Sequence, residues 1–156
     1  MKTTFSFTQT IAARRSYSIP RDTKESIKRA AKLVAKGEMP QLTNFNLSLV
    51  ALSDDELLEI NQASLGHDWY TDIITFEIDR AVDTLEAEIY LSVDRATENA
   101  LKAHVPLDVE LTHLVVHGVL HLAGYDDHEA AAKKRMKARE RFYLRILYTN
   151  NAAELQ

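Results

Sequence analysis

One long apolar segment, residues 106–123, is interrupted by three histidines spaced four residues apart. Its apolar spacing predicts a helix, and Gly124 is a natural terminator at its end. Positions four apart lie one turn above each other on a helix, so His113, His117 and His121 form a ladder along one face. An otherwise apolar helix has little reason to bury imidazoles. This segment therefore constrains both the fold and the function of the chain.

The rest of the chain divides into strand and helix patterns. Alternating or short apolar runs predict strands at residues 3–8, 45–52, 72–78 and 87–93. Helical spacing predicts helices at residues 22–35, 53–66, 94–103 and 129–148 in addition to 106–123. Ser53 and Glu56 form a capping-box pattern, and Asp94 is the predicted cap of the helix that follows it.

This order of elements predicts the α+β class. We expect a single-domain, three-layer α/β/α arrangement with a mixed sheet of roughly four strands, and a histidine-bearing helix like the metal helix of zinc metalloproteases. A length of 156 residues with 46% apolar residues fits one domain with a substantial core, so residues 1–156 are interpreted as a single unit.

No apolar stretch approaches the roughly 20 residues of a membrane span, and residues 1–11 lack the pattern of a secretory signal. We expect a soluble, cytoplasmic protein with no membrane partner. The net charge of −4 disfavours a protein that coats nucleic acid. Between Lys133 and Arg145, however, seven basic residues surround a single acid, Glu140, and a polyanion could dock there unless the run is simply a solvated helix face.

The chain has no cysteine, so any metal ligand must be histidine, aspartate or glutamate. His117 and His121 can grip one ion, and a turn at Gly124 can bring Asp127 or His128 back as the third ligand. Three protein ligands leave a position for water, which is the arrangement of hydrolytic zinc sites.

The HExxH zinc proteases use the same spacing of two histidines. Here the position after the first histidine is Gly118, so the glutamate that serves those proteases as general base is missing. Protease chemistry by that route is not supported.

The block at residues 117–126 reads HGVLHLAGYD and strongly resembles the signature HGxLHLxGYDH of the YbeY family of bacterial endoribonucleases, in which it carries a zinc ion. Residues 60–76 are similar to the family's second block, where a Thr-Asp pair leads into an apolar strand. Residues 88–92 are similar to the next strand. These matches extend roughly from residue 47 to residue 129, in the family's order.

The resemblance implies a function that composition and spacing do not reveal. It implies an endoribonuclease that uses one Zn²⁺ ion, is specific for single strands, and acts in maturation of the 3′ end of 16S rRNA and in ribosome quality control. The implied partners are RNA, as the small-subunit rRNA precursor, and the ribosome or ribosomal proteins.

Two departures from the family pattern affect the expected site. The family's third histidine falls at Asp127, with His128 one residue later. The geometry of the turn favours Asp127 as the third ligand, whereas the family's use of histidine favours His128. We expect Asp127, with His128 as the alternative. Many members have an arginine where this chain has Leu65, so a phosphate-binding role of that arginine cannot be transferred. His113 and Asp126 are candidates to orient the metal-binding imidazoles, and no residue stands out as the general base.

RNA contacts are expected from the basic face of the last helix and from three further arginines, Arg14, Arg15 and Arg21. Three aromatic residues, Trp69, Tyr70 and Tyr125, are candidates to stack an unpaired base, although such residues more often belong to the core. Two other functions compete with this interpretation: a metal-dependent hydrolase of another substrate, and a non-enzymatic, zinc-stabilised ribosome assembly factor.

Overall fold

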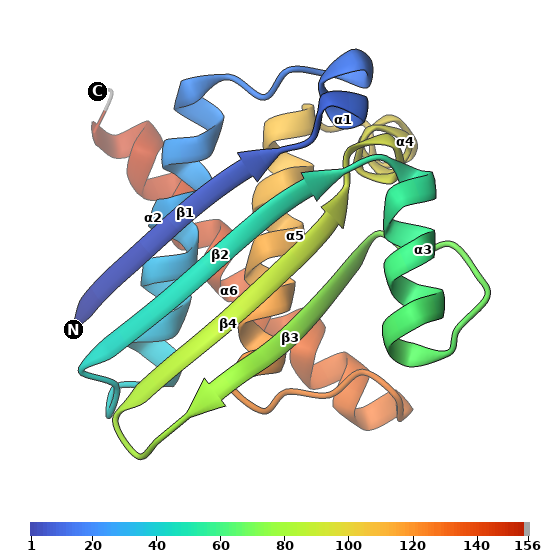
Figure 1. Cartoon of the computed structure of the whole chain (residues 1–156). Helices are drawn as coiled ribbons and strands as arrows, with labels where there is room; N and C mark the ends of the chain where they lie inside the picture. The colour runs from blue at the N-terminus through green and yellow to red at the C-terminus, as the bar shows by residue number, and fades with distance from the viewer. Residues whose placement is uncertain (155–156) are drawn as a thin grey trace.

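The computed structural model describes residues 1–154, with side chains described through residue 149, and its strands form one mixed sheet (Figure 1). The strands are β1 (Lys2–Gln9), β2 (Asn44–Leu52), β3 (Ile73–Arg80) and β4 (Thr84–Ser92). Their order in the sheet is β1-β2-β4-β3. The β1/β2 and β2/β4 pairs are parallel, and β3 runs antiparallel to β4 at the edge.

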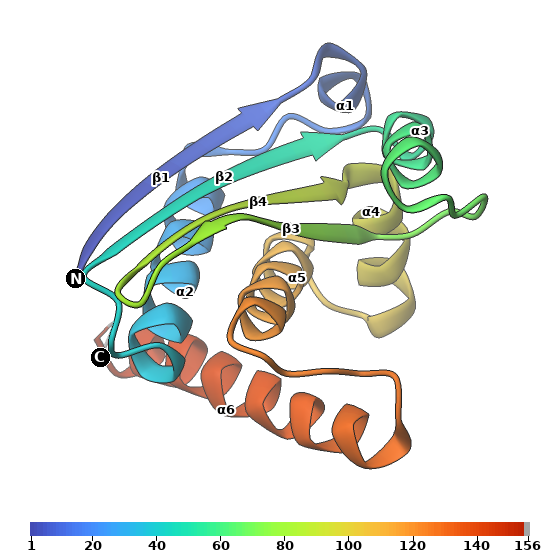
Figure 2. The ribbon, with the colours of Figure 1, turned by 60° about the horizontal axis from the view of Figure 1, so that its bottom comes forward.

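Alternation along the strands gives the sheet one buried face. Phe45, Leu47 and Leu49 of β2 are almost completely buried, while the alternate residues Asn44 and Asn46 are exposed. Two helices, α2 (Arg21–Glu38) and α5 (Leu107–Leu122), cover the buried face, and α6 (Ala130–Glu154) crosses beneath them (Figure 2). The main core therefore lies between the sheet and the pair α2 and α5.

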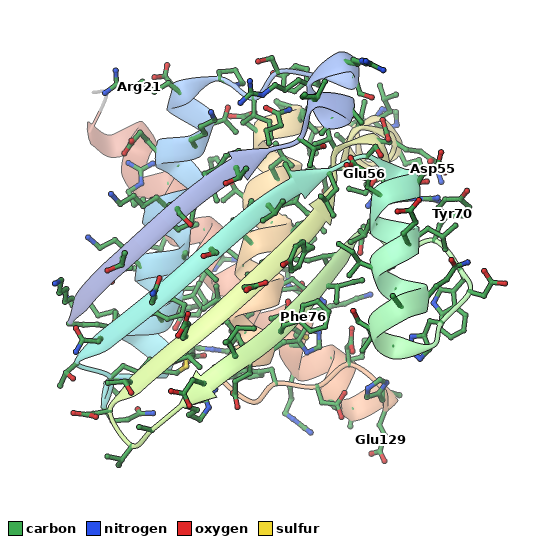
Figure 3. All side chains as sticks on the ribbon, viewed as in Figure 1. Arg21, Asp55, Glu56, Tyr70, Phe76 and Glu129 are labelled. Carbon is green, nitrogen blue, oxygen red and sulfur yellow. The ribbon has the colours of Figure 1, made fainter. Side chains whose placement is uncertain are left out.

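The opposite face of the sheet is covered at one end by α3 (Asp54–Leu65). Leu57 of this helix packs on Leu52 and Ile74, and the rings of Phe76 and Tyr90 lie at the edge of the same cluster (Figure 3). The predicted capping box is confirmed, because Ser53 and Glu56 exchange hydrogen bonds between side chain and backbone. The α+β class, the four-stranded mixed sheet and helices on both of its faces are thus as predicted.

Some predicted boundaries were wrong. The helix α4 (Val93–Ala103) is capped by Ser92, whose hydroxyl accepts from the Arg95 N–H, and not by Asp94. The Asp94 carboxylate instead accepts from the Ser16 hydroxyl and from the N–H of Asp54, so tertiary contacts determine its role. The short helix α1 (Ile11–Ser16) was not predicted, and α6 continues past the predicted end at residue 148.

The predicted histidine ladder is confirmed. From Glu110 to Leu122 each residue of α5 is buried except His113, His117 and His121. The apolar part of the helix is fixed in the core, and the imidazoles are the groups it leaves accessible. None of the helices among residues 1–154 combines the length and apolar character needed to cross a membrane.

Candidate metal centre

Gly118 allows α5 to lie close to the edge of the sheet. A Cβ atom at this position would lie 2.9 Å from Cδ1 of Ile89 and 3.1 Å from Oγ1 of Thr75. A larger side chain would have to displace the ends of the Ile89 and Thr75 side chains, which disfavours the glutamate found here in the HExxH proteases. The close approach places His117 and His121 beside β3.

The turn after α5 brings a carboxylate to these two histidines. Gly124 has φ of 102°, a value that L side chains rarely adopt, and the N–H of Tyr125 donates to the carbonyl of Leu120. The chain folds back after this turn, so that Asp127 lies close to both imidazoles.

Three ligand atoms form a compact triangle. Nε2 of His117 and Nε2 of His121 are 3.0 Å apart, and Oδ2 of Asp127 lies 3.6 Å from the first and 3.7 Å from the second. The point that lies in the plane of the three atoms and is equidistant from them is about 2.0 Å from each. This is the length of zinc bonds to nitrogen and oxygen. These residues could hold a metal ion.

Hydrogen bonds place a proton on Nδ1 of both rings, so that each ring, when neutral, presents the lone pair of Nε2. Nδ1 of His121 lies 3.0 Å from the carbonyl oxygen of Tyr125, which can only accept, so Nδ1 carries the proton. Nδ1 of His117 lies 2.8 Å from Oε1 of Glu140 and donates to that carboxylate. When both rings are neutral, two nitrogen lone pairs face each other at 3.0 Å beside a carboxylate, an arrangement that a bound cation stabilises. Burial lowers the pKa of His121, which favours the neutral form of its ring.

Glu140 is the functional residue that sequence reasoning missed. It lies on α6, is 7% exposed, and binds both His117 and His113, whose Nε2 is 3.2 Å from the same Oε1. Burial would raise the pKa of Glu140, but the hydrogen bonds from His113 and His117 hold it at about 2. The sequence does contain an indication that Glu140 is buried: its position continues the helical spacing of Met136, Tyr143 and Leu147, which form the inward face of α6.

His113 is linked to the candidate metal ligands through Glu140. Glu110 and Glu140 flank its ring and raise its pKa to about 10, so it is a cation at pH 7. It contacts His117 only through the shared carboxylate of Glu140, so it balances the charge of that carboxylate and is not one of the three candidate ligands.

The other predicted site residues lie to one side. Asp126 is exposed, and its carboxylate accepts from the N–H of His128 and lies 3.5 Å from that ring. The backbone of Tyr125, not Asp126, contacts the ring of His121. His128 has an 86% exposed side chain and clusters with Asp126 and Asp127, outside the group formed by the two helical histidines.

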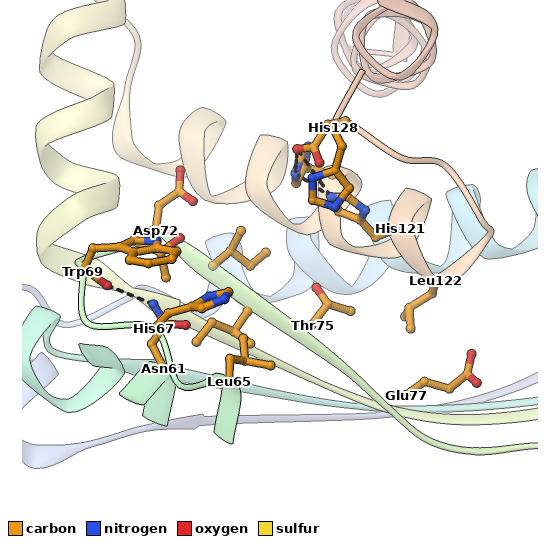
Figure 4. Close-up of a pocket in the computed structure, with 15 residues that line it drawn as sticks. Asn61, Leu65, His67, Trp69, Asp72, Thr75, Glu77, His121, Leu122 and His128 are labelled. Atoms are coloured by element: carbon orange, nitrogen blue, oxygen red, sulfur yellow. Dashed lines mark hydrogen bonds and ion pairs between the residues drawn. The ribbon is translucent and has the colours of Figure 1, made fainter. Parts of the chain in front are cut away.

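A cavity of about 530 Å³ opens over the three ligands (Figure 4). His67 and Trp69 lie on the wall facing His121 and His128, and Thr75 lies between the two groups. Asp72, beside Trp69, and Glu77, near Leu122, also line the cavity. A second cavity of about 280 Å³ shares Asp72, His117 and Asp127 with the first and contains Lys133, Lys137 and Glu140. The two cavities thus meet at the candidate metal centre.

The predicted RNA-contacting residues fall into two groups. Lys133 and Lys137 of the basic run adjoin the centre, but Arg21 lies at the opposite corner of the molecule from Glu129, which begins the segment leading into α6 (Figure 3). Tyr125 donates to Glu38 and is partly buried, so its ring is not free to stack. Leu65 lines the large cavity and supplies no charge there.

The fold and the site define a class: an α+β protein whose central helix and following turn supply a His-His-Asp group, able to hold a metal ion, beneath an open cavity. The family model described as Endoribonuclease YbeY matches residues 10–148. The chain therefore belongs to the YbeY family of endoribonucleases, hydrolases that act on RNA, as its motif predicted.

Individual relatives agree with this assignment. The chain is 38% identical to Endoribonuclease YbeY of Cytophaga hutchinsonii over 107 residues, which cover 69% of this chain and 73% of the relative. It is 35% identical to Endoribonuclease YbeY of Chloroherpeton thalassium, over 80% of this chain and 86% of the relative. The solution structure of protein TM1509 from Thermotoga maritima superposes with a TM-score of 0.63 at 25% identity, covering 96% of this chain and 93% of that one.

Proposed function

We propose that this chain is a zinc-dependent endoribonuclease that cuts single-stranded RNA, with His117, His121 and Asp127 as the ligands of one zinc ion. The observation that carries the proposal is the pair of Nε2 lone pairs 3.0 Å apart beside the Asp127 carboxylate, at an open cavity in a member of an endoribonuclease family. Two nitrogen donors and one carboxylate oxygen suit zinc, and a site with three protein ligands keeps a position for water.

When bound, zinc lowers the pKa of its water to about 7 and polarises a phosphoryl oxygen. The chain's own residues prepare the site for that chemistry. Glu140 and the Tyr125 carbonyl hold the imidazole protons on Nδ1, which keeps both Nε2 atoms available. The cavity admits a phosphodiester to the open side of the ligand triangle, and Lys133 and Lys137 favour an anion next to it.

The alternative of a purely structural zinc has less support. Such sites usually have four protein ligands. His113 is engaged by Glu110 and Glu140, and His128 lies against Asp126 with most of its ring exposed. Neither residue closes the site as a fourth ligand.

The proposed biological substrate is the 3′ end of the small-subunit rRNA precursor, in the cytoplasm and in contact with the ribosome. This part rests on the motif at residues 117–126 and on membership of the YbeY family. We assign the whole activity to a single domain.

The decisive experiment is cleavage of a labelled single-stranded RNA by the purified protein with its metal content measured. The wild type should contain zinc and cut, and a chelator should abolish cutting until zinc is restored. His121→Ala should lose zinc and cleavage together. The matched control is His104→Asn, because His104 is exposed and has φ of 56°, a conformation that asparagine tolerates. Cleavage retained in His121→Ala would refute the metal mechanism.

A further inference from the structure

A stacked pair of rings lies on the wall of the cavity opposite the metal ligands. The rings of His67 and Trp69 have centroids 4.2 Å apart and planes 17° apart, which is a parallel stack. Both residues line the cavity that contains His117, His121 and Asp127 (Figure 4). The stack and the ligands thus belong to one continuous space.

The pair is not part of the core. Trp69 is 58% exposed, although a tryptophan gains most from burial, and His67 is only partly buried. His67 covers one face of the indole, and much of the remaining ring surface faces solvent. An exposed aromatic surface beside an active-site cavity is typical of a ligand contact.

The backbone holds this surface in place. Asn61, which is 1% exposed, donates from Nδ2 to the carbonyl of Trp69 at 2.9 Å, and its own carbonyl accepts from the N–H of His67 at 3.2 Å. Gln62 donates to the carboxylate of Asp68, the residue between His67 and Trp69 in the chain. The last turn of α3 therefore fixes both ends of the stack, so a ligand binds a surface that is already ordered.

The neighbouring aromatic side chain, Tyr70, is also exposed but lies outside the cavity. The hydroxyl of Tyr70 donates to Asp55 at 3.0 Å beside α3, and Tyr70 does not line the cavity (Figure 3). Of the three aromatic residues singled out in the sequence, Trp69 is the one that faces the metal ligands.

We propose that the His67–Trp69 stack is a binding platform for one unpaired nucleobase of the RNA strand, next to the phosphodiester that lies at the metal centre. This inference rests on the proposed endoribonuclease function and adds a basis for single-strand preference. Each base has a planar π face, so stacking tolerates any sequence, but a base paired in a duplex is already stacked on its neighbours and cannot reach the platform.

The chain offers a direct reporter, because Trp69 is its single tryptophan. Zinc-loaded wild-type protein is titrated with a short single-stranded RNA and with the same sequence as a duplex, and tryptophan fluorescence is recorded while probe integrity is checked on a gel. We expect quenching by the single strand at concentrations where the duplex gives none.

Variants separate stacking from other effects. Trp69→Ala should weaken single-strand binding by about 5-fold or more and raise KM similarly, with unchanged zinc content, since loss of one base–aromatic stack has an effect of this size. Trp69→Phe should recover part of the binding, and Tyr70→Ala should stay within about 2-fold of wild type. Fluorescence anisotropy of a labelled RNA measures binding in variants that lack the tryptophan.

The outcomes distinguish the two proposals. Cleavage by the wild type without quenching, or binding by Trp69→Ala equal to that by Tyr70→Ala, would overturn the platform and leave the endoribonuclease proposal intact. Single-strand quenching by a wild type that contains zinc but does not cut would overturn the endoribonuclease proposal and retain the nucleobase site. Absence of both cutting and RNA binding would overturn both.

Discussion

Replacing Glu140 with glutamine tests whether a buried carboxylate on α6 sets the affinity of the metal centre. The Oε1 atom of Glu140 accepts from His117 at 2.8 Å, and the carboxylate is almost fully buried. The amide keeps the shape and one acceptor but removes the charge. A hydrogen bond to a charged group contributes about 1.5–3 kcal/mol. The expected loss of zinc affinity is therefore about 10- to 100-fold, which is also the range for removing an outer partner of a metal-bound histidine.

The assay is competition for zinc between the protein and a chromogenic chelator. Glu129→Gln is the matched control, since it removes the same charge from an exposed position just before α6. Metal-free Glu140→Gln must retain a cooperative unfolding transition, so that weaker binding is not the result of unfolding. A zinc affinity in Glu140→Gln within about 2-fold of that of Glu129→Gln would refute the reasoning, because the orienting charge would then contribute nothing.

Three other expectations follow from the same geometry. Gly118→Ala should lower the free energy of unfolding by about 1–3 kcal/mol in chemical denaturation, since its methyl group meets Ile89; unchanged stability would mean that α5 can move away at no cost. Asp127→Ala should lose bound zinc in a metal assay whereas His128→Ala should retain it, and the reverse pattern would make His128 the third ligand. The pKa of His113 is raised to about 10 in the folded chain, so the protonated ring stabilises the fold fully below about pH 6.5 and loses this effect as the pH rises toward 10. The Tm of the metal-free protein should therefore fall between these pH values, and His113→Gln should make the fall smaller.

Local patterns in the sequence were enough to predict the parts of the site that lie on one element. The apolar run with histidines four apart predicts α5 and its ladder because helix geometry is regular. The Ser53 and Glu56 capping box is likewise a contact between near neighbours. The turn beyond Gly124 is irregular, so spacing alone left Asp127 and His128 as alternatives, and only the folded chain brings Asp127 to both histidines.

Contacts between distant segments could not be predicted in this way. Glu140 and His117 are 23 residues apart and on different helices, so nothing local to either indicates that they meet. The order of the strands is a similar case, because β4 inserts between β2 and β3 by non-local pairing. The His67–Trp69 platform depends on a loop held by the buried Asn61, and a sequence pattern gives no measure of exposure.

The position of Glu140 on α6 has a consequence for newly made chains. A ribosome synthesises the polypeptide from its N-terminus, and the early part of a domain leaves it first. His117, His121 and Asp127 emerge before the helix that supplies their orienting carboxylate. Until α6 docks, His117 lacks the partner of its Nδ1 proton, and we expect the nascent chain to hold a metal ion more weakly than the finished protein does. We therefore expect full loading with metal only in chains whose last described helix has been made and packed against α5.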